Sequence, residues 1–201
     1  IPTDAVAAAA FHDGASVLGS LPFAAQLRRA VGVRAGDLAR AAPGDAVLFA
    51  RAGSPVPSLT LLAAGGKTAA AARIVADLDP DAPRPVPSTL DGVQLRQVPL
   101  GAVDLYYGTF DRTLVLTDDE QATLRSHRSA LEPPDLPDAT ARWAYLDVGR
   151  GLSALQSLAE LGGTSLSPGF VRRLASLRSV LAYVTHTRST ETLTVDVRQL
   201  P

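Results

Sequence analysis

The sequence predicts an α+β fold, in which helices pack on a largely antiparallel sheet. Short apolar strands alternate with segments of helical spacing, and several neighbouring strands are joined by turns too short for a parallel crossover. A chain of 201 residues with 46 % hydrophobic residues can bury a core without disulfides. We therefore expect a single α+β domain over residues 1–201.

The first part of the chain is predicted to contain three strands and three helices. The strands are short apolar runs bounded by Gly, Pro or Asp, and the helices have apolar residues three or four positions apart or are rich in Ala. The strands are expected at Asp4–Phe11, Ala46–Ala50 and Ser58–Ala63, and the helices at Leu21–Val31, Asp37–Ala42 and Thr68–Leu78. The second and third strands are predicted to form a hairpin.

The middle of the chain is predicted to hold three strands between two Pro-rich breaks. Four prolines between Asp79 and Ser88 predict a loop, because proline interrupts both ladders and helices. The strands are expected at Val93–Val98, Val103–Phe110 and Thr113–Leu116, with Asp111–Arg112 as a tight turn, followed by a helix over Asp118–Leu131 and a second break over Glu132–Ala139.

The last part of the chain is predicted to have the same order of strands and helices as the first part. A strand at Trp143–Val148, helices at Leu152–Leu161 and Phe170–Leu177, and a hairpin of Val180–Thr185 with Thr192–Val197 are expected. Two strand–helix–helix–hairpin repeats, residues 1–63 and 142–199, are thereby predicted, with a central helix–three-strand–helix segment between them. Leu48 lies 133 residues before Leu181, and Leu59 lies 134 before Leu193.

Composition excludes several classes of function. The chain has 19 Lys and Arg against 20 Asp and Glu, which argues against a nucleic-acid binder. It has no Cys, so disulfide scaffolds, thiol catalysis, zinc ribbons and iron–sulfur clusters are excluded. It has no run of roughly 20 apolar residues, so this segment is not expected to insert into a membrane. It has no Met, so we expect Ile1 to follow from processing or excision.

The segment Gly65–Gly66–Lys67–Thr68 follows an apolar strand and opens a helix, which is the context of a phosphate-binding loop. The complete motif needs another Gly five residues before Gly66, where this chain has Leu61. The spacing therefore favours a glycine turn before a helix, with Lys67 in solvent, over a nucleotide site.

The run Asp118–Asp119–Glu120 resembles an acid–base or metal cluster. Neighbouring residues of a helix lie about 100° apart, so the three carboxylates do not converge. Thr117 and Glu120 have the spacing of a capping box, which favours a structural role at a helix start.

Asp77, Asp79 and Asp81 have the spacing of the first ligands of a calcium-binding loop. Such a loop needs Gly at its sixth position and Glu at its twelfth, where this chain has Ala82 and Ser88. A helix end with Asx turns is favoured, and no metal site is expected.

The three histidines, His12, His127 and His186, stand apart in the sequence, so none forms a local metal-binding pair. A serine–histidine–aspartate triad assembled across space remains open, but no G-x-S-x-G elbow is present to hold its nucleophile. The sequence thus predicts no catalytic residue, and it predicts no cofactor.

The candidate ligand-binding residues are Tyr106, Tyr107 and Phe110, which cluster on one predicted strand. Strand alternation places Tyr107 on one face and the other two on the opposite face. Aromatic side chains on a sheet pack a core by default, and they also line ligand cavities.

Four segments of the chain are similar to a bacterial family, common in actinobacteria and cyanobacteria, whose members are described only as a domain of unknown function. The segments are Ile1–Val6, Ala42–Leu48, Tyr107–Leu116 and Ala144–Val148. The resemblance implies a location outside the cytoplasm, secreted or tethered by an anchor outside this segment. It implies no activity and supplies no catalytic residues.

The leading hypothesis is a non-enzymatic extracytoplasmic domain that binds a ligand or a protein partner at the cell envelope. One alternative is a carrier of a small apolar ligand in a cavity between sheet and helices, lined by residues such as Tyr107, Phe110, Leu155 and Phe170. Another is a hydrolase that uses His12 or His186. The sequence predicts neither the identity of the ligand nor the oligomeric state.

Overall fold

The structure is a computed structural model that describes residues 5–12, 35–52, 57–101, 103–122, 124, 136–161, 165, 167–187 and 189–199. In this part of the chain the strands are β1 (Ala5–Phe11), β2 (Ala46–Arg51), β3 (Ser58–Ala64), β4 (Val86–Leu90), β5 (Val93–Leu100), β6 (Val103–Phe110), β7 (Thr113–Thr117), β8 (Thr140–Asp147), β9 (Leu177–His186) and β10 (Glu191–Gln199). The helices described are α3 (Ala35–Ala41), α4 (Thr68–Leu78), α5 (Val148–Leu161) and α6 (Pro168–Ala175).

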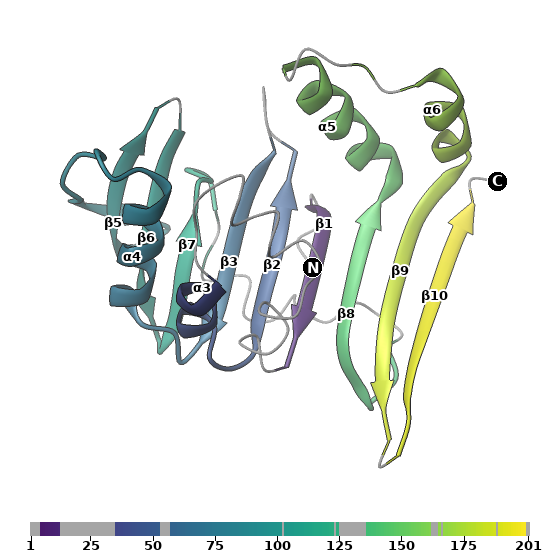
Figure 1. Cartoon of the computed structure of the whole chain (residues 1–201), viewed down its shortest axis with the longest axis horizontal. Coiled ribbons are helices and arrows are strands. Elements are labelled where there is room, and N and C mark those ends of the chain that lie inside the picture. Colours follow the sequence, from purple (N-terminus) through teal and green to yellow (C-terminus); the bar gives the residue numbers. More distant parts are fainter. Residues whose placement is uncertain are drawn as a thin grey trace. The chain divides into compact units, whose positions relative to one another are not determined.

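The predicted antiparallel α+β architecture is confirmed (Figure 1). Hydrogen-bonded neighbours follow the order β10-β9-β8-β1-β2-β3-β7-β6-β5-β4. The chain divides into two compact units. The first lies within Ile1–Ala10, Phe49–Leu59 and Ser129–Pro201, and the second within Phe11–Leu48 and Thr60–Arg128.

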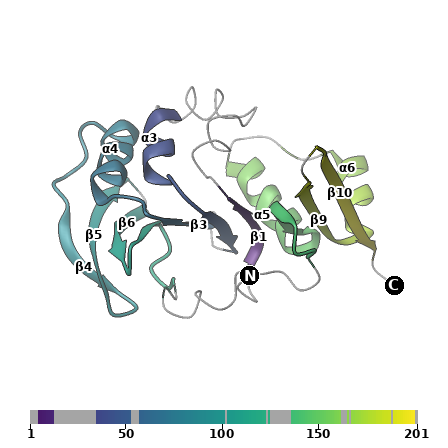
Figure 2. The ribbon, with the colours of Figure 1, turned by 90° about the horizontal axis from the view of Figure 1, so that it is seen from below.

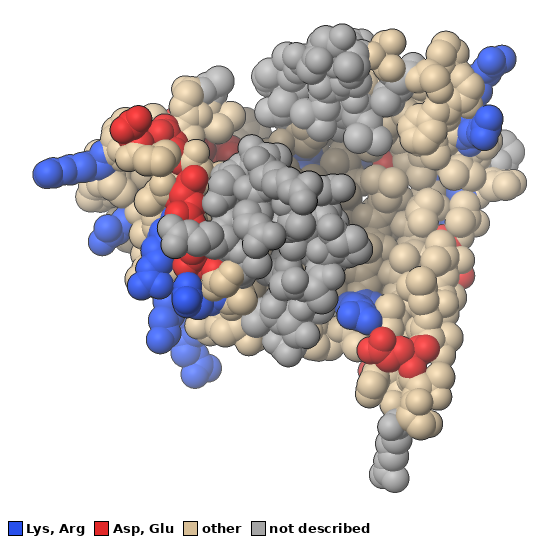
Figure 3. Space-filling model, in the orientation of Figure 1, with Lys and Arg blue, Asp and Glu red and all other residues tan. Residues whose placement is uncertain are grey.

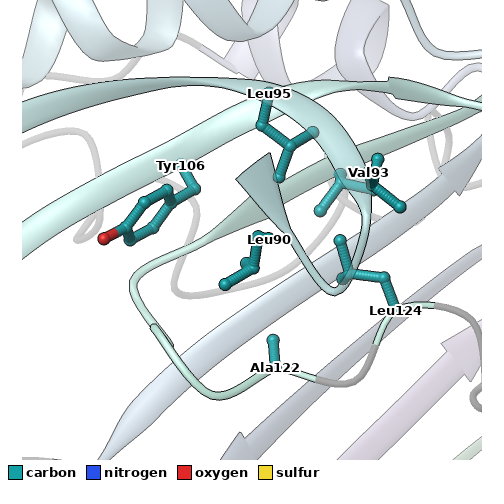
Figure 4. Close-up of a cluster of buried hydrophobic side chains, with 7 residues drawn as sticks. Leu90, Val93, Leu95, Tyr106, Ala122 and Leu124 are labelled. Carbon is teal, nitrogen blue, oxygen red and sulfur yellow. The ribbon is translucent and has the colours of Figure 1, made fainter. Parts of the chain in front are cut away.

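The second unit is built on the antiparallel strands β3, β7, β6, β5 and β4. Helix α4 packs on one face of these strands through an apolar side that includes Ala71, Ile74 and Val75, and it also contacts α3 (Figure 2). The opposite face carries a buried cluster of Leu90, Val93, Leu95, Tyr106, Val115, Ala122 and Leu124 (Figure 4). Both faces of this part of the sheet are therefore occupied by apolar packing.

The first unit contains the antiparallel strands β8, β9 and β10. Helix α5 begins directly where β8 ends, and α6 ends two residues before β9 begins. Ser167 caps α6 by accepting a hydrogen bond from the Phe170 N–H, and Pro168 occupies the first helical position, where its missing N–H is harmless.

Most of the predicted elements are confirmed with small changes in length. The β9–β10 hairpin forms, and β2 and β3 of the other predicted hairpin are hydrogen-bonded neighbours. The turn at Asp111–Arg112 has positive φ at both residues, as a two-residue hairpin turn of this twist requires. Leu177 begins a strand, whereas the sequence placed it at the end of a helix. The helix predicted over Leu21–Val31 lies outside the described residues.

The prediction of an unbroken loop over Asp79–Ser88 is wrong at its end, because β4 begins at Val86. Pro87 is tolerated there because β4 is the last strand of the order and needs no partner on its outer side. The turn that follows has positive φ at Asp91 and Gly92. An Asp-Gly pair between apolar residues is a hairpin signal that could have revealed this strand.

The helix predicted over Asp118–Leu131 is wrong where the structure describes it, since Asp118–Ala122 forms turns. The Thr117 hydroxyl accepts the Asp119 N–H at 3.0 Å, and the Asp119 carboxylate accepts the Gln121 N–H at 2.9 Å. These local side-chain bonds offer the backbone an alternative to a helix.

The internal repeat stays a prediction. The first unit of that repeat needs the helix at Leu21–Val31, which the structure does not describe. The described order of the last part, β8, α5, α6, β9 and β10, matches the order that the sequence predicts for it.

Candidate functional site: a groove beside helix α4

The turn between β3 and α4 sets one end of the site. Gly65 has a φ of +70°, a conformation that glycine adopts without strain. A Cβ on Gly66 would lie 2.2 Å from the carbonyl oxygen of Ala41 and 2.6 Å from the Cβ of Leu114. Both glycines therefore have a structural role, and α4 starts at Thr68, close against the sheet.

Register across three strands sets the rest of the site. Pro87 of β4 lies opposite Arg96 of β5, and Arg96 lies opposite Tyr107 of β6, so the three side chains form one row on one face. In the row beside it, Gln94 lies opposite Thr89 and donates its amide N–H to the Thr89 hydroxyl at 2.7 Å.

Four residues of these rows line a groove of about 620 Å³, namely Pro87, Gln94, Arg96 and Tyr107, and the groove also includes Thr68, Pro85 and Thr109. The Thr68 hydroxyl donates to the Thr109 hydroxyl at 3.4 Å, which joins the start of α4 to β6. Tyr107 is 1 % exposed, so it forms part of a firmly packed floor. The groove combines two proline rings and an aromatic ring with an exposed guanidinium, an amide and two hydroxyls.

Of the three predicted aromatic residues, Tyr107 contributes to this groove. Tyr106 and Phe110 belong to the opposite face, where Tyr106 is part of the buried cluster (Figure 4). Phe110 packs against this cluster. Burial raises the pKa of the Tyr106 hydroxyl above its usual 10.0, and the carboxylates of Glu120 and Asp104 raise it further.

Two of the residues named for an apolar cavity, Tyr107 and Phe110, do not share one lining. Tyr107 and Phe110 lie on opposite faces of β6. Phe170 is on α6 in the first unit and is exposed, and the side chain of Leu155 lies outside the described residues.

Of the groove residues, Thr68 belongs to the Gly65–Thr68 motif, whereas the sequence did not single out Pro85, Pro87, Gln94, Arg96 and Thr109. Each is an ordinary polar residue or proline, and their proximity depends on the pairing of β4 with β5 and of β5 with β6. The Asp91-Gly92 turn was the signal available for the first of these pairings.

Two of the histidines meet carboxylates at exposed positions. The Nδ1 of His12 lies 2.9 Å from Oδ1 of Asp45, and the Nδ1 of His186 lies 3.7 Å from Oε1 of Glu191. His127 lies outside the described residues.

The acidic motifs take structural positions. The Asp79 carboxylate accepts the Asp81 N–H at 3.0 Å, which is the Asx turn expected at the end of α4. Among the described residues no group of three His, Asp or Glu side chains is arranged to hold a metal ion.

A second hollow, of about 560 Å³, lies between α3 and α4. Its lining includes Asp37, Arg40, Arg73 and Asp77. Arg40 donates to the buried Asp37 carboxylate at 2.7 Å, so part of this charge is paired within the fold. The groove beside α4 is the better candidate, because it offers apolar walls together with a few polar groups.

None of the described helices has both the length and the apolar character needed to cross a membrane.

Comparisons with known proteins give no family. No protein-family model matches the chain, and a search of curated proteins found no match. Two solved structures of TP0453 are similar to it. Crystal form I has a TM-score of 0.48 and 11 % identity over 97 % of this chain and 75 % of that one. Crystal form IV has a TM-score of 0.44 and 10 % identity over 96 % and 76 %.

Proposed function

We propose that this chain is a non-enzymatic domain that binds a small ligand outside the cytoplasm, at the cell envelope, and that the ligand occupies the groove beside α4. The observation that carries the proposal is the row of Pro87, Arg96 and Tyr107 across three strands. It places an apolar surface beside a cation on elements fixed by the sheet ladder.

The groove supports one class of ligand. Its volume of about 620 Å³ is within the range of small-molecule sites, about 300–1,000 Å³. The proline rings, over the floor that buried Tyr107 packs, suit a flat or aliphatic group, and the guanidinium of Arg96 suits a carboxylate or phosphate. An amphipathic anion fits both features, which modifies the earlier alternative of a wholly apolar ligand.

The extracytoplasmic location is supported by the resemblance of four segments, including Tyr107–Leu116, to the bacterial family described above. Cell fractionation of a source strain that expresses the tagged natural protein tests it. Recovery outside the cytoplasm is expected, and recovery in the cytoplasm would contradict this part of the proposal.

The hydrolase alternative is supported by the short contact between His12 and Asp45, since a histidine held by a carboxylate is two-thirds of a triad. Hydrolysis of a panel of ester substrates that is lost in a His12→Ala variant would establish it. We expect no turnover above background from either protein.

Native mass spectrometry of gently purified protein tests ligand binding. We expect a bound species of a few hundred daltons, in keeping with the size of the groove. A Thr109→Trp variant, which fills the groove from β6, is expected to lose it. A Val103→Trp variant is the matched control, because Val103 is an exposed residue of the same strand outside the groove. A wild-type protein with no bound small molecule would overturn the proposal. So would a bound small molecule that the Thr109→Trp variant retains.

A further inference from the structure

Strand β10 forms an edge of the sheet in the described part of the chain. It is the first strand of the hydrogen-bonded order and pairs along one side with β9, in a regular register from Glu191 to Arg198. The other side of this ladder therefore presents backbone N–H and C=O groups in the spacing that a further strand needs.

The side chains of β10 leave a large apolar row uncovered. Leu193, Val195 and Val197 alternate along the strand, so they share one face, and they are 67, 53 and 51 % exposed. The surface over β9 and β10 shows few charged side chains (Figure 3). Three exposed β-branched or aliphatic residues on an edge are a surface that pairs with another strand.

Strand β4, at the other end of the strand order, has features that hinder pairing with a further strand, and β10 lacks them. Strand β4 has five residues and contains Pro87, which cannot donate to a ladder. Strand β10 has nine residues and no proline. Short strands and prolines commonly protect natural sheet edges from pairing. Since β10 has neither feature, its edge suits pairing with a further strand.

The sequence of β10 is complementary to itself in one antiparallel register. When Val195 lies opposite Val195 of a second copy, Leu193 lies opposite Val197, and the apolar row continues across the junction. On the other face Thr194 lies opposite Asp196, and Thr192 lies opposite Arg198, so no like charges are directly opposed.

The neighbouring two-fold registers are worse. Centring the pair on Asp196 places that carboxylate directly opposite itself, which is destabilising. Centring it on Thr194 places Glu191 opposite Val197 and breaks the apolar row. Glu191 is also held by Arg142, whose guanidinium lies 3.2 Å from its carboxylate.

We propose that two copies of this chain associate through their β10 edges, antiparallel and two-fold symmetric, with Val195 opposite Val195. The partner is a second copy because the same strand supplies both halves of the complementary pattern, as a two-fold interface requires. The interface is on the first unit and does not depend on the ligand groove, which is on the second.

The dimer is expected to be concentration-dependent. Stable interfaces engage about 20–30 residues from each partner, whereas one strand edge supplies nine. Sedimentation from ~10 µM to ~1 mM should show a shift from monomer to dimer in that range.

Cysteine cross-linking tests the register, because the chain has no natural Cys. Under mild oxidation, Val195→Cys is expected to form a disulfide dimer readily, since directly opposite Cβ atoms lie about 4.5–5.5 Å apart. Leu193→Cys alone should not cross-link, but a mixture of Leu193→Cys with Val197→Cys should. Val86→Cys, an equally exposed valine on β4, is the matched control and should form no disulfide-linked dimer.

A charge placed in the interface provides the second measurement. Val195→Arg is expected to remain monomeric to ~1 mM with an unchanged unfolding midpoint, while Val86→Arg dimerises like the wild type. A wild-type chain that is monomeric throughout this range would overturn the proposal. So would a dimer that Val195→Arg leaves intact, or cross-linking that is no faster for Val195→Cys than for Val86→Cys.

Discussion

Thr60 of β3 and Thr117 of β7 lie 57 residues apart in sequence and share a hydroxyl hydrogen bond of 2.7 Å. Both side chains are 1 % exposed, and the two residues are directly opposite in the β3–β7 ladder. The Thr117 hydroxyl also accepts the Asp119 N–H. One buried contact thus fixes the register of two strands and starts the turn after the second.

Replacing Thr117 by valine should destabilise the protein more than replacing Thr60. Thr117→Val leaves both the Thr60 hydroxyl and the Asp119 N–H without this partner, whereas Thr60→Val leaves the Thr117 hydroxyl its contact with Asp119. A buried polar group left unpaired costs about 1–3 kcal/mol. Urea unfolding measures the midpoint of each variant, and equal midpoints for Thr117→Val and Thr60→Val would contradict the expectation.

Gly66→Ala should be strongly destabilising. Its new Cβ would meet the Ala41 carbonyl oxygen at 2.2 Å, and backbone cannot move aside as a flexible side chain does. Overpacking of this kind costs about 3 kcal/mol. Gly169→Ala is the control, since its Cβ meets nothing within 4 Å and alanine favours the helix α6. A Gly66→Ala protein with the melting temperature of Gly169→Ala would show that the packing is not as described.

Tyr106 should make the folded state less stable at high pH. Its pKa is raised by burial and by Glu120 and Asp104, so above about pH 10 the unfolded chain loses this proton while the folded chain keeps it. Stability then falls as pH rises from the unfolded pKa through the folded one. Tyr106→Phe removes this dependence. Thermal unfolding of both proteins at pH 9 and pH 11 checks it, with a larger drop expected for the wild type.

Reversing the charge of Arg96 should weaken ligand binding without affecting the fold. Arg96 is exposed in the groove, and a charge-assisted contact to an anion contributes about 1.5–3 kcal/mol, so Arg96→Glu should lower affinity at least about tenfold. Arg178→Glu, an exposed arginine of β9, should bind as the wild type does. Equal affinity for the two variants, measured by calorimetry with the ligand released from the native protein, would exclude Arg96 from the site.

Local pattern was sufficient to predict most strands and helices. Alternation over Val103–Phe110 correctly separated Tyr106 from Tyr107, because successive strand side chains point to opposite faces. Strand β4 was not predicted because it contains Pro87, and a proline within a strand is compatible only with an edge strand. Which strand lies at an edge is set by strand pairing rather than by local sequence.

The rest of the candidate site depends on contacts distant in sequence. Arg96 meets Tyr107 and Pro87 only after β5 has paired on both sides. The turn after β7 was mistaken for a helix start, because Thr117 has a capping pattern but also accepts the Asp119 N–H in a turn beside Thr60. Local sequence does not decide between these two uses of one hydroxyl.

Amide NMR spectra provide the sharpest test of a small ligand in the groove beside α4. Small molecules released from denatured native protein would be added back to ligand-free protein. We expect saturable shifts concentrated at residues 94–96 and 107–109, which line the groove. Shifts concentrated elsewhere, or no shifts at any concentration, would contradict it.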